Sequence, residues 1–234
     1  MSVFIFIIYV AAAILPAILL LVYVYSMDKI EPEPMPFVIR LLFMGILAAV
    51  ISILLEEIGD GLIRFLASDQ TIMFVTVLTF LMVGAVEEGT KYIMLRTQTW
   101  KNSNFDYKFD GLVYAVSVSL GFAIFENVSY VFRYGLAVAG SRAVLAVPAH
   151  MAFSVAMGIF YSKAKFYRNR GREQTSRLCS WLSWLVPVGL HGLYDTLATL
   201  RGTTATVLYI SFVVAMYVVM FFLIRYESKH DEHL

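Results

Sequence analysis

Long apolar segments constrain the fold of this chain more than any other feature of its sequence. A helix that spans a bilayer needs about 20 predominantly apolar residues, because backbone groups inside the bilayer must be hydrogen-bonded within the protein. Seven segments reach this length, and they run near Val3 to Tyr25, Phe37 to Leu55, Thr71 to Leu95, Gly111 to Phe132, Arg142 to Tyr161, Leu178 to Leu200 and Thr203 to Ile224. With 60% hydrophobic and only 15% charged residues, little sequence remains for a soluble domain. The sequence predicts an all-α, polytopic membrane helix bundle of about seven transmembrane helices, folded as a single membrane-embedded domain over residues 1–234.

The distribution of lysine and arginine predicts how this bundle is oriented. Loops on the cytoplasmic side of a membrane carry an excess of these residues. With seven helices, most of the basic residues fall on one side, including the run from Lys163 to Arg177. The other side receives only Arg64, Arg133, Arg142 and Arg201. We therefore expect an external N-terminus and a cytoplasmic C-terminus, with residues 230–234 as a short, solvated cytoplasmic tail.

Ionisable residues inside the apolar segments are the candidate functional residues, because a charge at membrane depth is costly and marks a site or an ion pathway. Four of the segments carry them, namely Glu87, Glu88 and Lys91 in the third, Glu126 in the fourth, His150 in the fifth, and His191 and Asp195 in the sixth. A helix rises about 1.5 Å per residue, so the expected orientation gives the depth of each residue. The fourth, fifth and sixth segments place theirs in the outer half of the membrane, and the glutamate pair lies near the middle. We expect one shared site, closer to the external side.

The third segment offers acid–base chemistry. Lys91 follows Glu87 by four residues and Glu88 by three, so its ammonium can neutralise one carboxylate and leave the other available. Two carboxylates so close repel each other and therefore lose their protons at different pH values. This suits one of them to take a proton from water and return it to a leaving amine. The spacing does not decide which glutamate is the base. A structural ion pair between helices is the alternative interpretation.

The remaining residues indicate metal chemistry. Glu126, His150 and His191 form a set of two histidines and one carboxylate, and such sets hold catalytic zinc with one position left for water. Asp195 shares a helix face with His191 and is either a fourth ligand or the carboxylate that orients this histidine. A histidine satisfied by its own aspartate, and a His150 that only forms hydrogen bonds, are the alternatives. The HExxH and GxSxG motifs of soluble proteases are absent.

Four short motifs, in this order, resemble those of the PrsW intramembrane proteases, which are related to the CAAX prenyl endopeptidases and the bacteriocin-immunity proteins. They are EExxK at Glu87, Glu88 and Lys91, FxxxE with a following Asn at Phe122, Glu126 and Asn127, the single His150, and HxxxD at His191 and Asp195. The resemblance implies that Glu87 or Glu88, beside Lys91, activates water. It also implies that Glu126, His150, His191 and Asp195 hold a divalent metal, with zinc favoured, or polarise the scissile carbonyl, and that Asn127 supports them.

The same resemblance implies a function. It predicts a protease of the bacterial plasma membrane that makes the first, external cut in a single-pass membrane anti-sigma factor, and so starts sigma-factor release during envelope stress. Membrane lipid is the other expected partner, and no nucleic acid is expected. A proton- or metal-ion-coupled transporter is the main alternative, because buried ionisable residues also mark ion pathways. An inactive scaffold that binds partner helices is a third interpretation. The pair Glu56-Glu57 lacks a following lysine and is interpreted as an interface acid pair.

Overall fold

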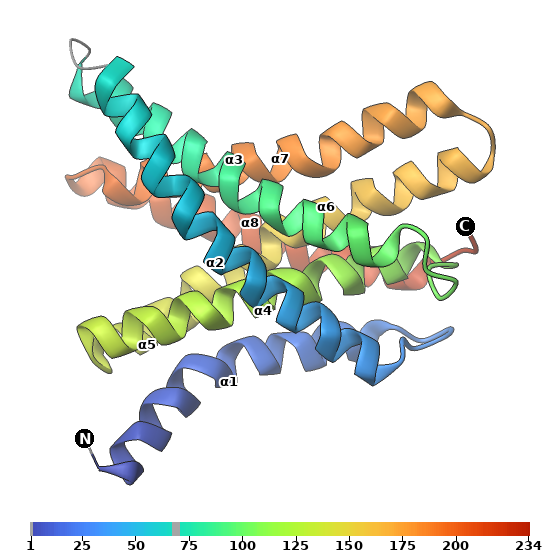
Figure 1. Ribbon diagram of the computed structural model, residues 1–234, viewed down its shortest axis with the longest axis horizontal. Coiled ribbons are helices and arrows are strands. Elements are labelled where there is room, and N and C mark those ends of the chain that lie inside the picture. The colour runs from blue at the N-terminus through green and yellow to red at the C-terminus, as the bar shows by residue number, and fades with distance from the viewer. Residues whose placement is uncertain (1, 67–70) are drawn as a thin grey trace.

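The computed structural model describes residues 2–66 and 71–234 as a bundle of α-helices (Figure 1). Seven long helices and one short helix make up this part of the chain: α1 (Val3–Met27), α2 (Met35–Leu66), α3 (Ile72–Thr99), α4 (Lys108–Tyr134), α5 (Ala137–Val144), α6 (Ala146–Asn169), α7 (Glu173–Thr199) and α8 (Thr203–Lys229). The predicted all-α class is confirmed for these residues. Met1 and residues 67–70 lie outside the described part, as does the side chain of Arg64, one of the basic residues expected on the external side.

Five stretches of described helix are long and apolar enough to cross a membrane. They are α1, Met35–Ile63 of α2, α4, the combined stretch of α5 and α6 (Ala137–Asn169), and α8. The two other long helices, α3 and α7, were also predicted to cross, and they are not among these five stretches of the described residues. These two carry most of the candidate site residues. The five apolar stretches support a multi-pass membrane protein. That α3 and α7 also cross the membrane stays a prediction.

The fifth predicted helix differs most from the observed structure. The predicted span from Arg142 to Tyr161 lies within one apolar stretch, Ala137–Asn169, but the structure breaks this stretch at Leu145 into the short α5, which holds Arg142, and α6, which begins at Ala146. Pro148 is the physical reason, since it has no N–H to donate to the carbonyl of Val144, four residues earlier. The hydroxyl of Tyr217 on α8 donates to that carbonyl instead, at 3.0 Å. The break lets α5 turn away from α6 and brings its arginine toward α4.

Helix α4 forms the centre of the bundle. Most of its residues from Phe109 to Ala123 are buried, and it packs against α1, α2 and α6. Its contact with α2 is close: a Cβ atom added at Gly121 would lie 2.0 Å from the carbonyl oxygen of Leu42. Small residues allow such close approach between membrane helices. Figure 1 shows α2 and α3 running side by side and α6 and α7 forming a hairpin, so that α3 and α7 meet near the centre of the bundle.

The C-terminal tail packs against the loop before α4. The N–H of Phe109 donates to the carboxylate of Asp231 at 2.8 Å, and the N–H of Leu234 donates to the carbonyl of Asp106 at 2.6 Å. The tail histidines, His230 and His233, are exposed as expected of solvated side chains. The tail itself is thus tied to the bundle at the end that also holds the α1–α2 connection.

Two buried acids lie in the α1–α2 connection, outside the membrane-spanning helices. Asp28 and Glu33 are 5% and 3% exposed. Burial raises the pKa of Asp28 from its ordinary 3.8 to about 6, and that of Glu33 from 4.5 to about 7. The carboxylate of Asp28 accepts a hydrogen bond from the N–H of Glu33 at 3.3 Å. This end of the bundle therefore favours the protonated form of both groups.

Candidate active site

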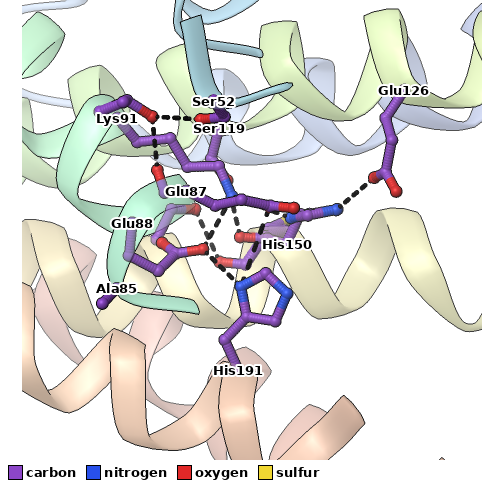
Figure 2. Close-up of polar contacts among 12 residues, drawn as sticks. Ser52, Ala85, Glu87, Glu88, Lys91, Ser119, Glu126, His150 and His191 are labelled. Carbon is purple, nitrogen blue, oxygen red and sulfur yellow. Dashed lines mark hydrogen bonds and ion pairs between the residues drawn. The ribbon is translucent and has the colours of Figure 1, made fainter. Parts of the chain in front are cut away.

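Glu87, Glu88 and Lys91 lie on the face of α3 that turns toward the centre of the bundle (Figure 2). They are 8%, 0% and 1% exposed. The Nζ atom of Lys91 lies 2.7 Å from Oε1 of Glu88 and 3.2 Å from Oε2 of Glu87. The sequence predicted that the ammonium would neutralise one carboxylate. In the structure it contacts both, so the two negative charges share one positive charge.

Lys91 also links this pair to α6. Its Nζ atom lies 3.1 Å from Nδ1 of His150 and 4.0 Å from the ring centre of Phe122. Because an ammonium only donates hydrogen bonds, Nδ1 of His150 must accept, and its proton must be on Nε2. That nitrogen lies 2.8 Å from Oε2 of Glu126 on α4. The tautomer of His150 is therefore determined by Lys91 on one side and Glu126 on the other.

His191 joins the site from α7. Its Nδ1 atom lies 3.0 Å from Oε1 of Glu88, and its Nε2 atom lies 3.4 Å from Oδ2 of Asp195. Its ring stacks on Phe153 with centroids 4.8 Å apart. The predicted contact between His191 and Asp195 is present, and the imidazole is held between two carboxylates from different helices.

Close packing of α3 and α7 explains why His191 reaches Glu88. A Cβ atom added at Gly84 would lie 3.1 Å from the carbonyl oxygen of Val188, so the backbones are nearly in contact. Trp184 adds a hydrogen bond from its indole N–H to the carbonyl of Ala85, at 3.2 Å. The glycine and this bond fix the separation of the two helices one turn away from Glu88.

Glu126 has a basic partner that the sequence did not identify. Nη2 of Arg142 lies 2.9 Å from Oε2 of Glu126, and its Nε donates to Oδ1 of Asn127 at 2.6 Å. Asn127 in turn donates to the carbonyl of Ala13 on α1 at 3.0 Å. A carboxylate inside a membrane needs a partner, and α4 offers no basic residue close to Glu126. The sequence placed Arg142 only on the side expected to be external, because no spacing along the chain shows that α5 contacts α4.

These side chains surround a cavity of about 710 Å³ between α2, α3, α4, α6 and α7. Its wall includes the following predicted site residues: Glu87, Glu126, His150, His191 and Asp195. Glu88 and Lys91 lie behind this wall. The cavity extends to the ends of α4 and α5, where Arg133, Tyr134 and Ser141 line it.

Glu56 of α2 also lines the cavity, and the sequence analysis missed it. Of the pair Glu56-Glu57, interpreted as an interface acid pair, only Glu56 lines the cavity, whereas Glu57 is exposed and lies outside the cavity wall. Helix α2 continues to Leu66, beyond the predicted end at Leu55, so both residues lie within a regular helix. Neighbours in a helix point about 100° apart, and only one of the two faces the cavity.

Three of the residues could hold a metal ion. Glu87, Glu88 and His191 each offer one ligand atom, and these atoms lie within 4.8 Å of one another. Carboxylates and imidazole are suitable ligands for zinc. The Oε2 atom of Glu88 is buried and has no hydrogen-bond partner among the described residues, so its lone pairs are available to bind a metal ion. The geometry therefore fits a divalent cation, although only His191 of this group belongs to the metal set that the sequence predicted.

Comparisons with known proteins give the class of this chain. A model described as the PrsW family of intramembrane metalloproteases matches residues 33–224. Protease PrsW of Geobacillus kaustophilus is 35% identical over 190 residues, covering 80% of this chain and 78% of the relative. Protease PrsW of Bacillus subtilis is 35% identical over 196 residues, covering 81% and 82%, and that of Clostridioides difficile is 32% identical over 209 residues, covering 88% and 85%. No solved structure matches the chain.

The fold, the buried site and these matches together define a protease whose site lies inside a membrane-embedded helix bundle. The family match covers most of the chain, and the relatives match over most of their own length. The chain belongs to the PrsW family of intramembrane metalloproteases. It is therefore a peptidase and a multi-pass membrane protein with protein substrates. The alternative prediction of an ion-coupled transporter has no support from these findings.

Proposed function

We propose that this protein makes the first cut in a single-pass membrane anti-sigma factor, on the external side of the bacterial plasma membrane. The observation that carries the proposal is the cavity, which joins the Glu87 carboxylate to the ends of α4 and α5. The distribution of basic residues supports an external position for these ends. Relatives named Protease PrsW in bacteria support the assignment to a bacterial membrane. The cut would start the release of the sigma factor under envelope stress.

Glu87 is the proposed general base. It lies on the cavity wall, whereas Glu88 is fully buried and bound to both Lys91 and His191. Glu87 accepts a proton from the attacking water and returns it to the nitrogen of the leaving amine. Lys91 holds the two carboxylates together and limits their net charge. The choice between the two glutamates, which the sequence left open, thus follows from which of them a substrate can reach.

Glu88 and His191 are the proposed ligands of a divalent metal, with zinc favoured, and Asp195 orients His191 through its other ring nitrogen. Oε2 of Glu88 is free for this role, and His191 lies between Glu88 and Asp195. The metal would supply a Lewis acid that polarises the scissile carbonyl and makes water a better nucleophile near neutral pH. Glu87 lies within the same compact group, close enough to take a proton from water there.

Glu126 and His150 are proposed to act on the substrate carbonyl, not to hold the metal: the Nε2–H of His150, which donates to Glu126 in this structure, would donate to that carbonyl when a substrate binds, and Glu126 would keep its ion pair with Arg142. They are bonded to each other, and Arg142 occupies the same oxygen of Glu126. Both line the cavity, so a peptide bond inside it would meet the imidazole beside the acid group. The sequence-based resemblance allowed either role for these two residues. The bond between His150 and Glu126, and the ion pair of Glu126 with Arg142, favour the role at the carbonyl over the role of metal ligands.

The test is cleavage of a candidate anti-sigma factor in proteoliposomes that contain the purified protein. We expect Glu87→Gln to lower kcat by roughly a hundredfold or more, as is typical for loss of a general base. Glu57→Gln, one residue from Glu56 and outside the cavity, is the control for a changed carboxylate on a membrane helix. Full activity of Glu87→Gln would contradict the proposed base. Cleavage only on the cytoplasmic side would contradict the proposed orientation.

A further inference from the structure

Four carboxylates line the cavity, and three of them have a partner within the protein. Their contacts are Glu87 with Lys91 at 3.2 Å, Glu126 with Arg142 at 2.9 Å, and Asp195 with His191 at 3.4 Å. The fourth, Glu56, has no hydrogen bond or ion pair with any residue in the ranges 2–66 and 71–234. The proposed chemistry does not use it. Its place in the wall therefore calls for a separate explanation.

Helix α2 directs Glu56 into the cavity by its register. The residues of this helix that line the cavity are Ala49, Ser52, Ile53 and Glu56, which follow one another at helical spacing. Ser52 is bonded to Thr90 of α3 at 2.7 Å, and this contact fixes the face of α2 near Glu87. Glu56 lies one turn further along the same face and is half-buried. Its carboxylate is thus presented to the cavity by a rigid element.

No positively charged side chain among the described residues forms an ion pair with Glu56. Among the charged groups around it, the carboxylates of Glu87 and Glu126 act on it most strongly and have the same sign, while His191 and Lys91, which contact other acids, act on it less. Lys91 and Arg142 are already bound to other acids. Arg133 also lines the cavity, but it is exposed and forms no ion pair with Glu56. Since an unpaired carboxylate is costly at this depth, a cation that enters the cavity would bind it strongly.

We propose that Glu56 is a substrate-specificity residue, whose carboxylate binds a lysine or arginine side chain of the peptide segment in the cavity. The inference rests on the proposed function, because it takes a membrane protein segment as the occupant. Basic residues are rare within a membrane span and less frequent at its external end than at its cytoplasmic end, so one placed near the cut would mark that position. A salt bridge to Glu56 would therefore fix which peptide bond lies beside Glu87.

The experiment uses synthetic single-span peptides with a fluorophore and a quencher on either side of the cleaved bond. One lysine is moved through each position near that bond, and norleucine at the same position is the uncharged reference. For each peptide, kcat and KM are measured with the wild type and with the variants Glu56→Gln, Glu56→Lys and Glu57→Gln. Binding of the same peptides to the Glu87→Gln variant, with and without the added substitution Glu56→Gln, is measured in parallel by fluorescence anisotropy.

At one position, we expect the wild type to prefer lysine over norleucine by roughly tenfold in kcat/KM, as is usual for a charge-assisted hydrogen bond. Most of this preference should be in KM. Glu56→Gln should bring the ratio of the two peptides close to one, Glu56→Lys should reverse it in favour of norleucine, and Glu57→Gln should keep it.

Two results would overturn the inference. One is a wild type that cleaves all peptides without a lysine preference at any position. The other is a Glu56→Gln variant that keeps the preference or slows all peptides equally, as a purely structural residue or a proton carrier would. If the wild type cleaves no peptide, the proposed function fails, and the anisotropy measurement still decides whether lysine binding depends on Glu56.

Discussion

Replacement of Arg142 by alanine is a stringent test of how the site is built, because this residue belongs to none of the sequence motifs and contacts the site only in the structure. The substitution removes the ion pair to Glu126 and the bond to Asn127, at 2.9 and 2.6 Å. Loss of one partner from a fully buried ion pair costs about 3 to 5 kcal/mol. The side chains of Arg142 and Glu126 are 14% and 25% exposed, and Glu126 keeps its bond to His150. We therefore expect a smaller loss of unfolding free energy, about 2 kcal/mol, together with a lower kcat/KM because Glu126 loses one of the two contacts that hold it beside His150.

The assay is cleavage of a membrane substrate, with thermal unfolding measured in the same preparation. Arg142→Lys should recover only part of the activity, because a lysine cannot contact Glu126 and Asn127 at the same time as a planar guanidinium does. Arg201→Ala, an exposed arginine on the side expected to be external, is the control and should change activity less than twofold. If Arg142→Ala were as active as Arg201→Ala, the proposed support of Glu126 would be refuted.

Other predictions concern stability. Gly121→Ala would place a Cβ atom 2.0 Å from the carbonyl of Leu42, so it should destabilise the bundle by about 1 to 3 kcal/mol, whereas Gly61→Ala, with no atom within 4 Å, should be neutral or stabilising. Thermal unfolding in detergent separates the two, and equal melting temperatures would contradict the close contact of α2 and α4. The raised pKa of Glu33, about 7 against an ordinary 4.5, means that the folded state binds more protons than the unfolded state between these values. Stability should therefore be greatest below pH 4.5 for this group and fall as the pH rises through 7, and Glu33→Gln should flatten the slope of melting temperature against pH. An unchanged slope would show that Glu33 does not titrate in this range.

Contacts within one helix could be predicted from the sequence. The spacing of Glu87, Glu88 and Lys91 placed the ammonium beside the carboxylates, and the spacing of His191 and Asp195 placed the acid beside the imidazole. Both contacts are present in the structure. They follow from helix geometry alone, because residues three and four apart share a face.

Contacts between helices were only partly predictable. The sequence indicated that the ionisable residues meet in one region, because a charge in a membrane needs a partner. It did not show that Lys91 contacts His150, or that Arg142 reaches Glu126. The second contact depends on the break before α6, where Pro148 leaves a carbonyl free for Tyr217. Such pairings are set by how helices pack and where they end, and a single sequence carries little information on either.

The length of α2 decided the role of Glu56. The predicted end at Leu55 left Glu56 and Glu57 at a helix terminus, where they would form one exposed acidic pair. The helix instead continues to Leu66, and its regular twist sends one glutamate into the cavity and the other outward. Hydrophobicity sets where a segment can enter the membrane, but it does not set where the helix ends.

The metal content of the purified protein tests the central claim most directly. Wild type, His191→Ala, Glu88→Gln and His150→Ala are purified in the same detergent, their divalent metals are measured by mass spectrometry, and cleavage is assayed in the same samples. Our account predicts a near-stoichiometric metal in the wild type and in His150→Ala, and its loss together with activity in His191→Ala and Glu88→Gln. An active wild type without metal, or a metal that is lost in His150→Ala and kept in His191→Ala, would contradict it.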